Sequence, residues 1–135
     1  MHQPHPTLAL VALVVIARNE AACIERCLRS AKPFVDRMVV LDTGSTDDTV
    51  ARAKACGADV HEMAWTNDFS AARNAVLDLA NADWNLVMDA DEWLESGGEH
   101  LRTLASASPL LGMVCIQSDT DADDATSRLV SWVPR

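Results

Sequence analysis

The sequence predicts an α/β fold in which a mostly parallel, Rossmann-like sheet is flanked by helices. Short apolar runs alternate with stretches of helical spacing from the start of the chain to its second half. The apolar runs are rich in Val, Ile, Leu and Ala, which is typical of strands buried on both faces. Polar residues follow several of these runs directly. Alternation of this kind is typical of doubly wound sheets, which bind ligands beyond the carboxyl ends of their strands.

The first strand and the first helix are expected within residues 8–30. Residues 8–17 are the longest apolar stretch, far short of the ~20 residues of a membrane helix, so we predict no transmembrane segment. Their Val and Ile content predicts a buried strand over 8–16. No Lys or Arg precedes Arg18, so the basic start of a signal peptide is absent. Helical spacing then predicts a helix over 20–30, which Lys32 and Pro33 end.

The later elements follow the same alternation. Further strands are expected over 37–42, whose centre is the apolar run 38–41, and over 58–63, 84–88 and 113–117. Further helices are expected where apolar residues recur at helical spacing: 47–56, 70–81 and, as a short helix, 99–105. Ser and Thr in the turn before residue 47 can cap that helix, and Gly57 can end it. We expect a disordered tail over 1–7 and one domain over 8–135.

The charge balance excludes some classes of partner. The chain has 11 Lys and Arg against 20 Asp and Glu, a net charge of −9. Such a chain is a poor binder of nucleic-acid phosphates or of anionic membrane surfaces. Residues 1–73 hold 8 basic and 9 acidic residues, whereas residues 74–135 hold 3 and 11. An acidic second half suits a divalent cation or, alternatively, a solvated acidic surface.

The cysteine spacing favours reduced thiols. None of the four cysteines forms a C-x-x-C pair, so the spacing of a zinc site is absent. Buried free thiols are typical of cytoplasmic proteins. The tryptophans are assigned to the core or to the wall of a cleft.

Two carboxylates follow the fourth expected strand. Asp89 and Asp91 are separated only by Ala90, so their like charges repel at short range if both lie at the strand tip. A divalent cation removes that repulsion, and oxygen ligands suit Mn²⁺ or Mg²⁺, which also bind phosphates. The alternative is a solvated acidic turn leading into a helix N-terminus.

Polar segments also follow the first and second strands. Asp42 precedes a tight turn at Gly44, which places a carboxylate beside backbone amides and suits ribose hydroxyls or the edge of a base. Arg18, Asn19 and Glu20 follow the first strand and can meet a base or a phosphate. Both segments have the alternative role of capping the helix that follows them.

A fourth polar group lies at the start of the helix expected over 70–81. Arg73 is about one turn inside this helix and, if aimed at the site, can pair with a diphosphate. The alternative is a surface arginine whose stem packs along the helix. The α/β topology predicts that these segments converge at one edge of the sheet.

The order of these motifs resembles a known family. Residues 14–20, 39–47, 67–74 and 83–92 are similar to the ordered motifs of family-2 glycosyltransferases, whose fold is of the GT-A type. The resemblance covers roughly residues 8–95 and favours the branch that includes lipopolysaccharide-core and peptide glycosyltransferases. It implies that the chain is the N-terminal, nucleotide-sugar-binding part of a GT-A domain, truncated so that the acceptor half is missing.

The resemblance also implies a set of nucleotide-sugar-binding residues. They are Ala17, Arg18, Asn19, Glu20, Asp42, Gly44, Arg73, Asp89, Ala90 and Asp91. By resemblance, Asp42 contacts uracil or ribose, residues 17–20 line the nucleoside pocket, and Arg73 lies near the donor. Asp89 and Asp91 hold the metal and the ribose, with Asp91 as the direct ligand. Many members have a second Asp where this chain has Thr43, so a contact by that second Asp is not implied here.

The implied activity is metal-assisted transfer of a sugar, with inversion, from a nucleotide-sugar, expected to be a UDP-sugar, to an acceptor hydroxyl. The alternatives are a non-catalytic nucleotide-binding module and a haloacid-dehalogenase-like phosphatase with Asp89 as nucleophile. The acceptor is expected to be a glycan, a lipid-linked molecule or a peptide, as in synthesis of cell-envelope polysaccharide. We expect a cytoplasmic protein that meets the inner face of the membrane through its acceptor.

The second half of the chain offers no catalytic base. The acidic residues after Glu99 lie in an expected loop without a rigid frame. The truncation therefore predicts donor binding with transfer close to background, and a sheet edge that a second copy can cover in a homo-oligomer.

Overall fold

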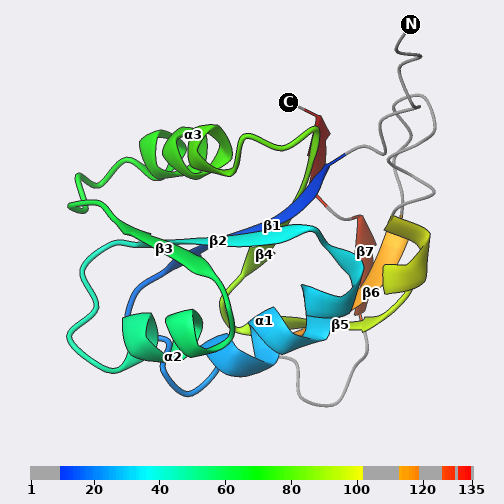
Figure 1. Ribbon diagram of the computed structural model, residues 1–135, viewed down its shortest axis with the longest axis horizontal. Helices are drawn as coiled ribbons and strands as arrows, with labels where there is room; N and C mark the ends of the chain where they lie inside the picture. The colour runs from blue at the N-terminus through cyan, green and yellow to red at the C-terminus, as the bar shows by residue number, and fades with distance from the viewer. Residues whose placement is uncertain (1–9, 102–112, 119–125, 130, 135) are drawn as a thin grey trace, which may run out of the picture.

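The protein has a three-layer α/β architecture around a central five-stranded sheet (Figure 1). The computed structural model describes residues 10–101, 113–118, 126–129 and 131–134. The sheet contains β1 (Val11–Ala17), β2 (Arg37–Asp42), β3 (Asp59–Glu62), β4 (Trp84–Asp89) and β8 (Ser131–Pro134). Its order is β3-β2-β1-β4-β8, in which β8 is antiparallel and the other strands are parallel. The predicted mostly parallel sheet is confirmed.

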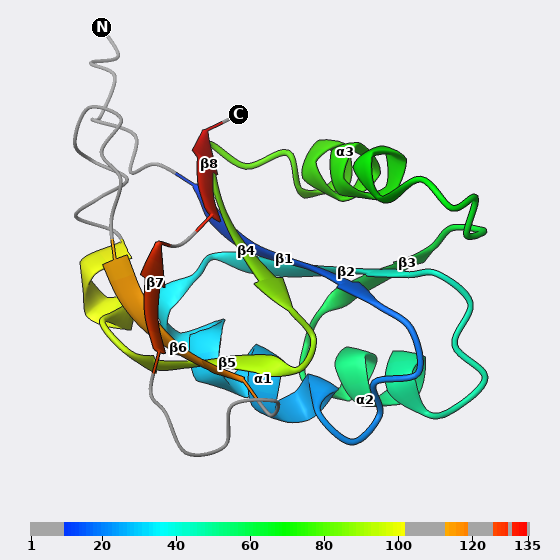
Figure 2. The same cartoon turned by 180° about the vertical axis from the view of Figure 1, so that it is seen from behind.

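Helices cover both faces of this sheet. Helix α1 (Ile24–Ala31) and α2 (Thr49–Ala55) lie on one face, and α3 (Phe69–Ala80) lies on the other (Figure 2). The strands β1, β2 and β4 are largely apolar because successive side chains enter opposite layers, whereas most residues of the edge strand β3 are exposed. In β1, Leu13 and Val15 pack with α1 and α2, while Val14 packs with α3.

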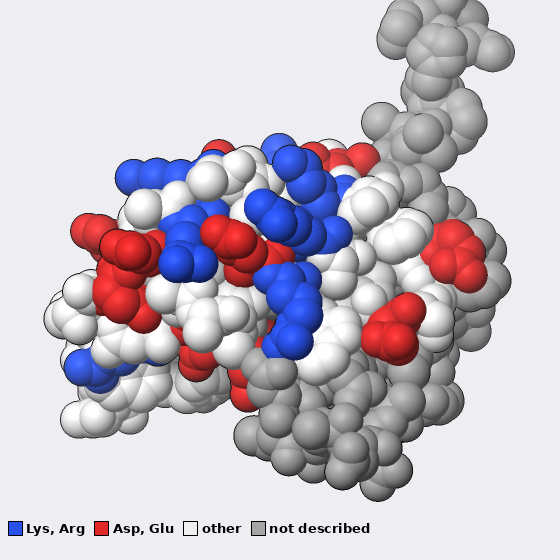
Figure 3. Space-filling model, turned by 90° about the horizontal axis from the view of Figure 1, so that it is seen from below, with Lys and Arg blue, Asp and Glu red and all other residues white. Residues whose placement is uncertain are grey.

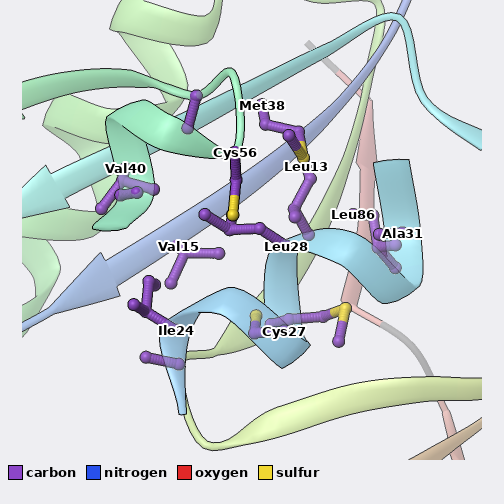
Figure 4. Packing of buried hydrophobic residues seen from close by; sticks show 14 of the residues in the cluster. Leu13, Val15, Ile24, Cys27, Leu28, Ala31, Met38, Val40, Cys56 and Leu86 are labelled. Carbon is purple, nitrogen blue, oxygen red and sulfur yellow. The ribbon is translucent and has the colours of Figure 1, made fainter. Parts of the chain in front are cut away.

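The layer below the sheet holds the larger of two apolar clusters. Leu13, Ile24, Leu28 and Leu86 are fully buried and come from β1, α1 and β4 (Figure 4). Burial of a side chain of this size contributes about 1.5–3 kcal/mol, so the sheet and α1 form one stable unit. Cys23, Cys27 and Cys56 are free thiols.

A second, antiparallel sheet follows the central strands. It contains β5 (Glu92–Ser96), β6 (Met113–Ser118) and β7 (Thr126–Leu129), in the order β5-β6-β7. Of these later strands, β6 was predicted from the sequence, whereas β5, β7 and β8 were not. Two short 3-10 helices complete the described elements, η1 (Lys32–Phe34) and η2 (Gly98–His100).

The predicted tail and the predicted short helix lie largely outside the described part of the chain. Residues 1–7 are not described, so the expected tail stays a prediction. The helix expected over 99–105 is described only at its start, where η2 takes its place.

Two helices begin later than their spacing predicts. Helix α1 begins at Ile24 rather than at residue 20, and α2 begins at Thr49 rather than at residue 47. The residues ahead of each helix instead bond to each other across two loops, as the site shows below. Backbone and side-chain groups used in that way are not available to start a helix.

Helix α3 offers a direct test of its N-terminal cap. The Asp68 carboxylate accepts a hydrogen bond of 3.0 Å from the backbone N–H of Ala71, whereas Asp48, at the same position of α2, makes no side-chain cap bond. We expect Asp68→Ala to lower the free energy of unfolding by about 1 kcal/mol, because an N–H of the first turn loses its partner.

The matched control is Asp48→Ala. It removes an exposed carboxylate from the same helix position and is expected to leave the free energy of unfolding nearly unchanged. Urea titrations of both variants measure the difference. Equal losses in the two variants would show that the cap bond is unimportant.

The helical underside of the molecule is more basic than the net charge suggests. Figure 3 shows Lys and Arg gathered in the middle of this face, with acidic side chains beside them. Arg26 and Arg29 of α1 and Arg52 of α2 are exposed there, and Glu25 lies 3.8 Å from both Arg29 and Arg52. Among the described residues, no helix has the length and apolar character needed to cross a membrane.

Candidate functional site

The register of the parallel strands brings three predicted segments to one edge of the sheet. Ala17 at the end of β1 pairs with Asp42 at the end of β2, and Ile16 pairs with Asp89 at the end of β4. Neighbouring strands in a sheet lie about 4.8 Å apart. The turns that follow β1, β2 and β4 therefore lie side by side.

Asp42 is buried and its carboxylate accepts three hydrogen bonds within its own turn. The side chain is 2% exposed. Its Oδ2 accepts hydrogen bonds from the backbone N–H of Gly44 at 3.1 Å and of Ser45 at 2.9 Å. The Ser45 hydroxyl donates to Oδ1. Gly44 has a φ of +115°, a conformation that side-chain-bearing residues rarely adopt, so the turn depends on glycine there.

The turn of Asp42 borders a cavity of about 370 Å³. Its lining comprises Asp42, Gly44, Ser45, Glu62, Met63 and Ala64. Glu62 comes from β3, where it pairs with Asp42 in the sheet. Polar groups therefore dominate this side of the edge.

The loops after β1 and β2 are bonded to each other. Asn19, with a φ of 53°, accepts at Oδ1 from the backbone N–H of Thr46 at 2.8 Å and donates its own N–H to Ser45 Oγ at 2.8 Å. The N–H of Glu20 donates to Thr49 Oγ1 at 2.8 Å. Asn19 therefore does not cap α1, whose N-cap residue Cys23 makes no side-chain cap bond. Asn19 instead holds the second loop in place.

Asp47 adds a pH-dependent contact between these loops. Its carboxylate accepts hydrogen bonds from the hydroxyl of Thr49, from the N–H of Thr49 at 3.0 Å and from the N–H of Ala21 at 3.2 Å. The hydroxyl bond of Thr49, with the backbone bonds, holds the pKa of Asp47 below its usual value of 3.8. A depressed pKa stabilises the fold above the unfolded-state pKa, and this contribution disappears as the pH falls through the folded-state pKa.

We therefore expect Asp47→Asn to destabilise the fold at neutral pH and to lose this effect in acid. The free energies of unfolding of wild type and variant should differ at neutral pH and converge below the usual aspartate pKa. Urea titrations over a pH series measure the gap. A gap that stays constant into acid would show that the charge of Asp47 is irrelevant.

A second cavity of about 370 Å³ lies on the α3 side of the same edge. Its lining comprises Ile16, Ala17, Arg18, Glu20, Thr43, Trp65 and Phe69. Three of these residues belong to the segment that the sequence analysis assigned to a nucleoside pocket, and Arg18 is exposed there. From the sequence, Trp65 was expected only in the core or in the wall of a cleft, and Phe69 had no predicted role. The feature of the sequence that could have identified both residues is their position in the loop and first helical turn that precede Arg73.

Arg73 packs beside this second cavity. Its guanidinium carbon lies 5.1 Å from the centroid of the Phe69 ring. Its Nε is buried and has no hydrogen-bond partner among the described residues. The arginine is therefore half-buried and packs along α3 against the ring of Phe69, one turn earlier, so its pairing with a diphosphate stays a prediction.

The D-x-D turn joins β4 to β5. Asp89 is exposed, Ala90 is buried and Asp91 is half-buried. The turn leads into a strand, so the alternative of an acidic turn that feeds a helix N-terminus is wrong. The turn places the carboxylates of Asp89 and Asp91 beside the ends of β1 and β2.

Two buried side chains hold this turn from inside. Glu92, 6% exposed, accepts at Oε1 from the backbone N–H of Asp89 at 2.8 Å. The Cys27 thiol donates to the carbonyl of Asp89 at 3.6 Å. Burial raises the pKa of Cys27, and the nearby charges of Glu92, Asp89 and Asp91 raise it further, so the thiol keeps its proton. Both backbone polar groups of Asp89 are thus engaged. Sequence reasoning missed these roles.

The D-x-D turn suits a divalent cation that is coordinated partly by carboxylates of the protein and partly by a phosphate of the substrate. Among the described residues, no cluster of three or more His, Cys, Asp or Glu side chains could hold a metal ion. Mg²⁺ needs no such cluster, because it binds through one or two carboxylates and completes its coordination with water and substrate phosphates. Asp89 and Asp91 supply carboxylates of this kind.

Comparison with known proteins agrees with this geometry. The family model for glycosyl transferase family 2 matches residues 12–109. A TPR repeat-containing protein of Synechococcus elongatus is 44% identical over 117 residues, which is 85% of this chain and 29% of that protein. Glycosyltransferase SunS of Bacillus phage SPbeta is 42% identical over 79 residues, which is 57% of this chain and 19% of that protein.

The fold also resembles solved enzyme structures. Glucosyl-3-phosphoglycerate synthase of Mycobacterium tuberculosis, in complex with Mn²⁺, UDP and glucosyl-3-phosphoglycerate, matches with a TM-score of 0.57 and 30% identity. The match covers 68% of this chain and 40% of that chain. The same synthase has been solved with Mg²⁺ and UDP. The chain thus spans less than half the length of these relatives. With most of its length matched by the family model, the chain belongs to glycosyl transferase family 2.

Proposed function

We propose that this edge of the sheet binds a nucleotide-sugar, and that the protein transfers its sugar to an acceptor hydroxyl with inversion. The observation that carries the proposal is the meeting of three groups at one edge: the turn of Asp42, the cavity beside Trp65 and the D-x-D turn. These groups suit the ribose, the base and the diphosphate of one extended ligand.

UDP is the proposed nucleotide. Support comes from the M. tuberculosis synthase, whose structures contain UDP or UDP-glucose together with Mn²⁺. At 30% identity over 68% of this chain, that enzyme supplies an analogy for the donor and none for the acceptor. The acceptor of this protein is proposed only as a hydroxyl of a glycan, a lipid-linked molecule or a peptide.

A divalent cation, Mn²⁺ or Mg²⁺, is the proposed cofactor, with Asp91 as direct ligand and Asp89 beside it. When bound, the cation would offset the negative charge of the leaving diphosphate. The contribution of the chain itself is to hold the two carboxylates. Glu92 and Cys27 do this by engaging the N–H and carbonyl of Asp89.

Calorimetry with the purified chain tests donor binding. UDP should bind measurably, and Mn²⁺ should strengthen the binding relative to EDTA. ADP and GDP serve as comparison ligands, and hydrolysis of UDP-glucose reports turnover. Hydrolysis of UDP-glucose or transfer above background would exclude the non-catalytic module, whereas turnover of p-nitrophenyl phosphate through Asp89 would favour the phosphatase. Failure of UDP to bind in either buffer would refute the proposal.

A further inference from the structure

We infer that Trp65 and Phe69 form an aromatic wall that holds the nucleobase by stacking. This inference rests on the proposed function, because it concerns the nucleoside end of the donor. It adds two residues to the site.

The exposure of the two rings is the first observation. Among the described residues, the exposed large hydrophobic side chains are Trp65 at 39%, Phe69 at 49% and Leu79 at 41%. Two of these three line one cavity. Large apolar groups gathered at a polar edge usually mark a binding surface.

The fixed orientation of the rings is the second observation. The Trp65 indole N–H donates to Asn67 Oδ1 at 3.0 Å, and Asn67 has the left-handed φ of 60°. The Phe69 ring is held near the Arg73 guanidinium, 5.1 Å from its centroid. Polar contacts, and not core packing, therefore hold both rings in place while they stay exposed. A ligand that stacks on them loses little side-chain freedom of the protein.

The rest of the cavity suits a flat heteroaromatic ring. Ile16 and Ala17 supply apolar surface, and Thr43 is held to β1 by a hydrogen bond of 3.0 Å from its N–H to the carbonyl of Ala17. Arg18 and Glu20 add charged groups of both signs. Every nucleobase has two flat faces that can stack on aromatic side chains, while polar groups at its edge can meet such a rim.

Binding measurements with separated ligand parts test the aromatic wall. We expect Trp65→Leu and Phe69→Leu each to weaken UDP binding about tenfold to hundredfold, because the base loses a stacking surface. Binding of inorganic pyrophosphate with Mn²⁺, which has no base, should stay unchanged. Trp65→Phe should restore most of the affinity for UDP.

Leu79→Ala is the matched control. It removes an equally exposed apolar side chain from α3, away from the cavity, and should leave UDP binding unchanged. A second readout is tryptophan fluorescence, which UDP should quench in wild type and much less in Trp65→Phe. Circular dichroism confirms that each variant is folded.

The outcomes separate this inference from the proposed function. Wild-type UDP affinity that survives the Trp65→Leu and Phe69→Leu double substitution would overturn the aromatic wall and leave nucleotide-sugar binding intact. Equal losses for UDP and pyrophosphate would also overturn it, since the rings would then act on the whole site. A wild type that binds no UDP would refute the proposed function, and the inference with it.

Discussion

Replacing Asp91 with Ala should abolish the extra stability that Mn²⁺ gives to the UDP-bound protein. A ligand that binds only the folded state contributes about 2.7 kcal/mol when its free concentration is a hundredfold above Kd. In wild type this contribution should depend on the metal, because Asp91 is the proposed ligand. Unfolding titrations with UDP, in Mn²⁺ and in EDTA, measure the increment.

The fold of the Asp91→Ala variant should survive. The described contacts that hold its turn come from Glu92 and Cys27, and both engage the backbone of Asp89. Asp78→Ala, which removes an exposed carboxylate from α3, is the control and should keep the full increment. A Mn²⁺-dependent increment that persists unchanged in Asp91→Ala would refute the metal assignment.

Replacing Asp42 with Ala should reduce both the stability of the fold and the affinity for UDP. The free energy of unfolding should fall by roughly 3 kcal/mol, the upper end of the range for one hydrogen bond to a charged group, because the three bonds that this buried carboxylate accepts share one turn and do not add. UDP affinity should fall about ten- to hundredfold with or without metal, because the turn beside the nucleoside loses its shape.

The two readouts distinguish positioning from direct contact. Asp42→Asn keeps one acceptor oxygen and should recover part of the stability and part of the affinity together. Urea titrations and calorimetry on the same samples test this link. A variant that loses affinity but keeps wild-type stability would show that Asp42 contacts the nucleotide directly and does not hold the turn.

Much of the fold could be predicted because burial on both faces leaves a local signal. The apolar runs predicted β1, β2 and β4 to within a few residues, as their side chains enter two apolar layers. The mostly exposed strand β3 was predicted from its place in the alternation of strands and helices. The strand β5 was missed because it begins with a charged residue, Glu92, whose burial depends on a partner at Asp89. No periodicity in the sequence distinguishes such a glutamate from a solvated one.

The candidate site was predicted in part for the same reason. Once the strands are placed, their parallel topology brings Ala17, Asp42 and Asp89 to one edge of the sheet, independently of the conformation of the loops. Trp65 could not be placed with them, since residues 63–68 form an irregular connection without periodicity, and Phe69 directly follows this connection as the first residue of α3. Their exposure became known only from the packed structure.

The sequence by itself determined the parallel order of strand and helix, the edge that carries the site and the family of the chain. Only the tertiary structure decided what each polar group does there. Asn19 forms hydrogen bonds with Ser45 and Thr46, which lie 26 and 27 residues further along the chain. The carboxylate of Asp42 accepts hydrogen bonds within its own turn. The physical reason is that burial patterns repeat along a strand, whereas hydrogen bonds between loops depend on the register of whole strands and leave no local pattern.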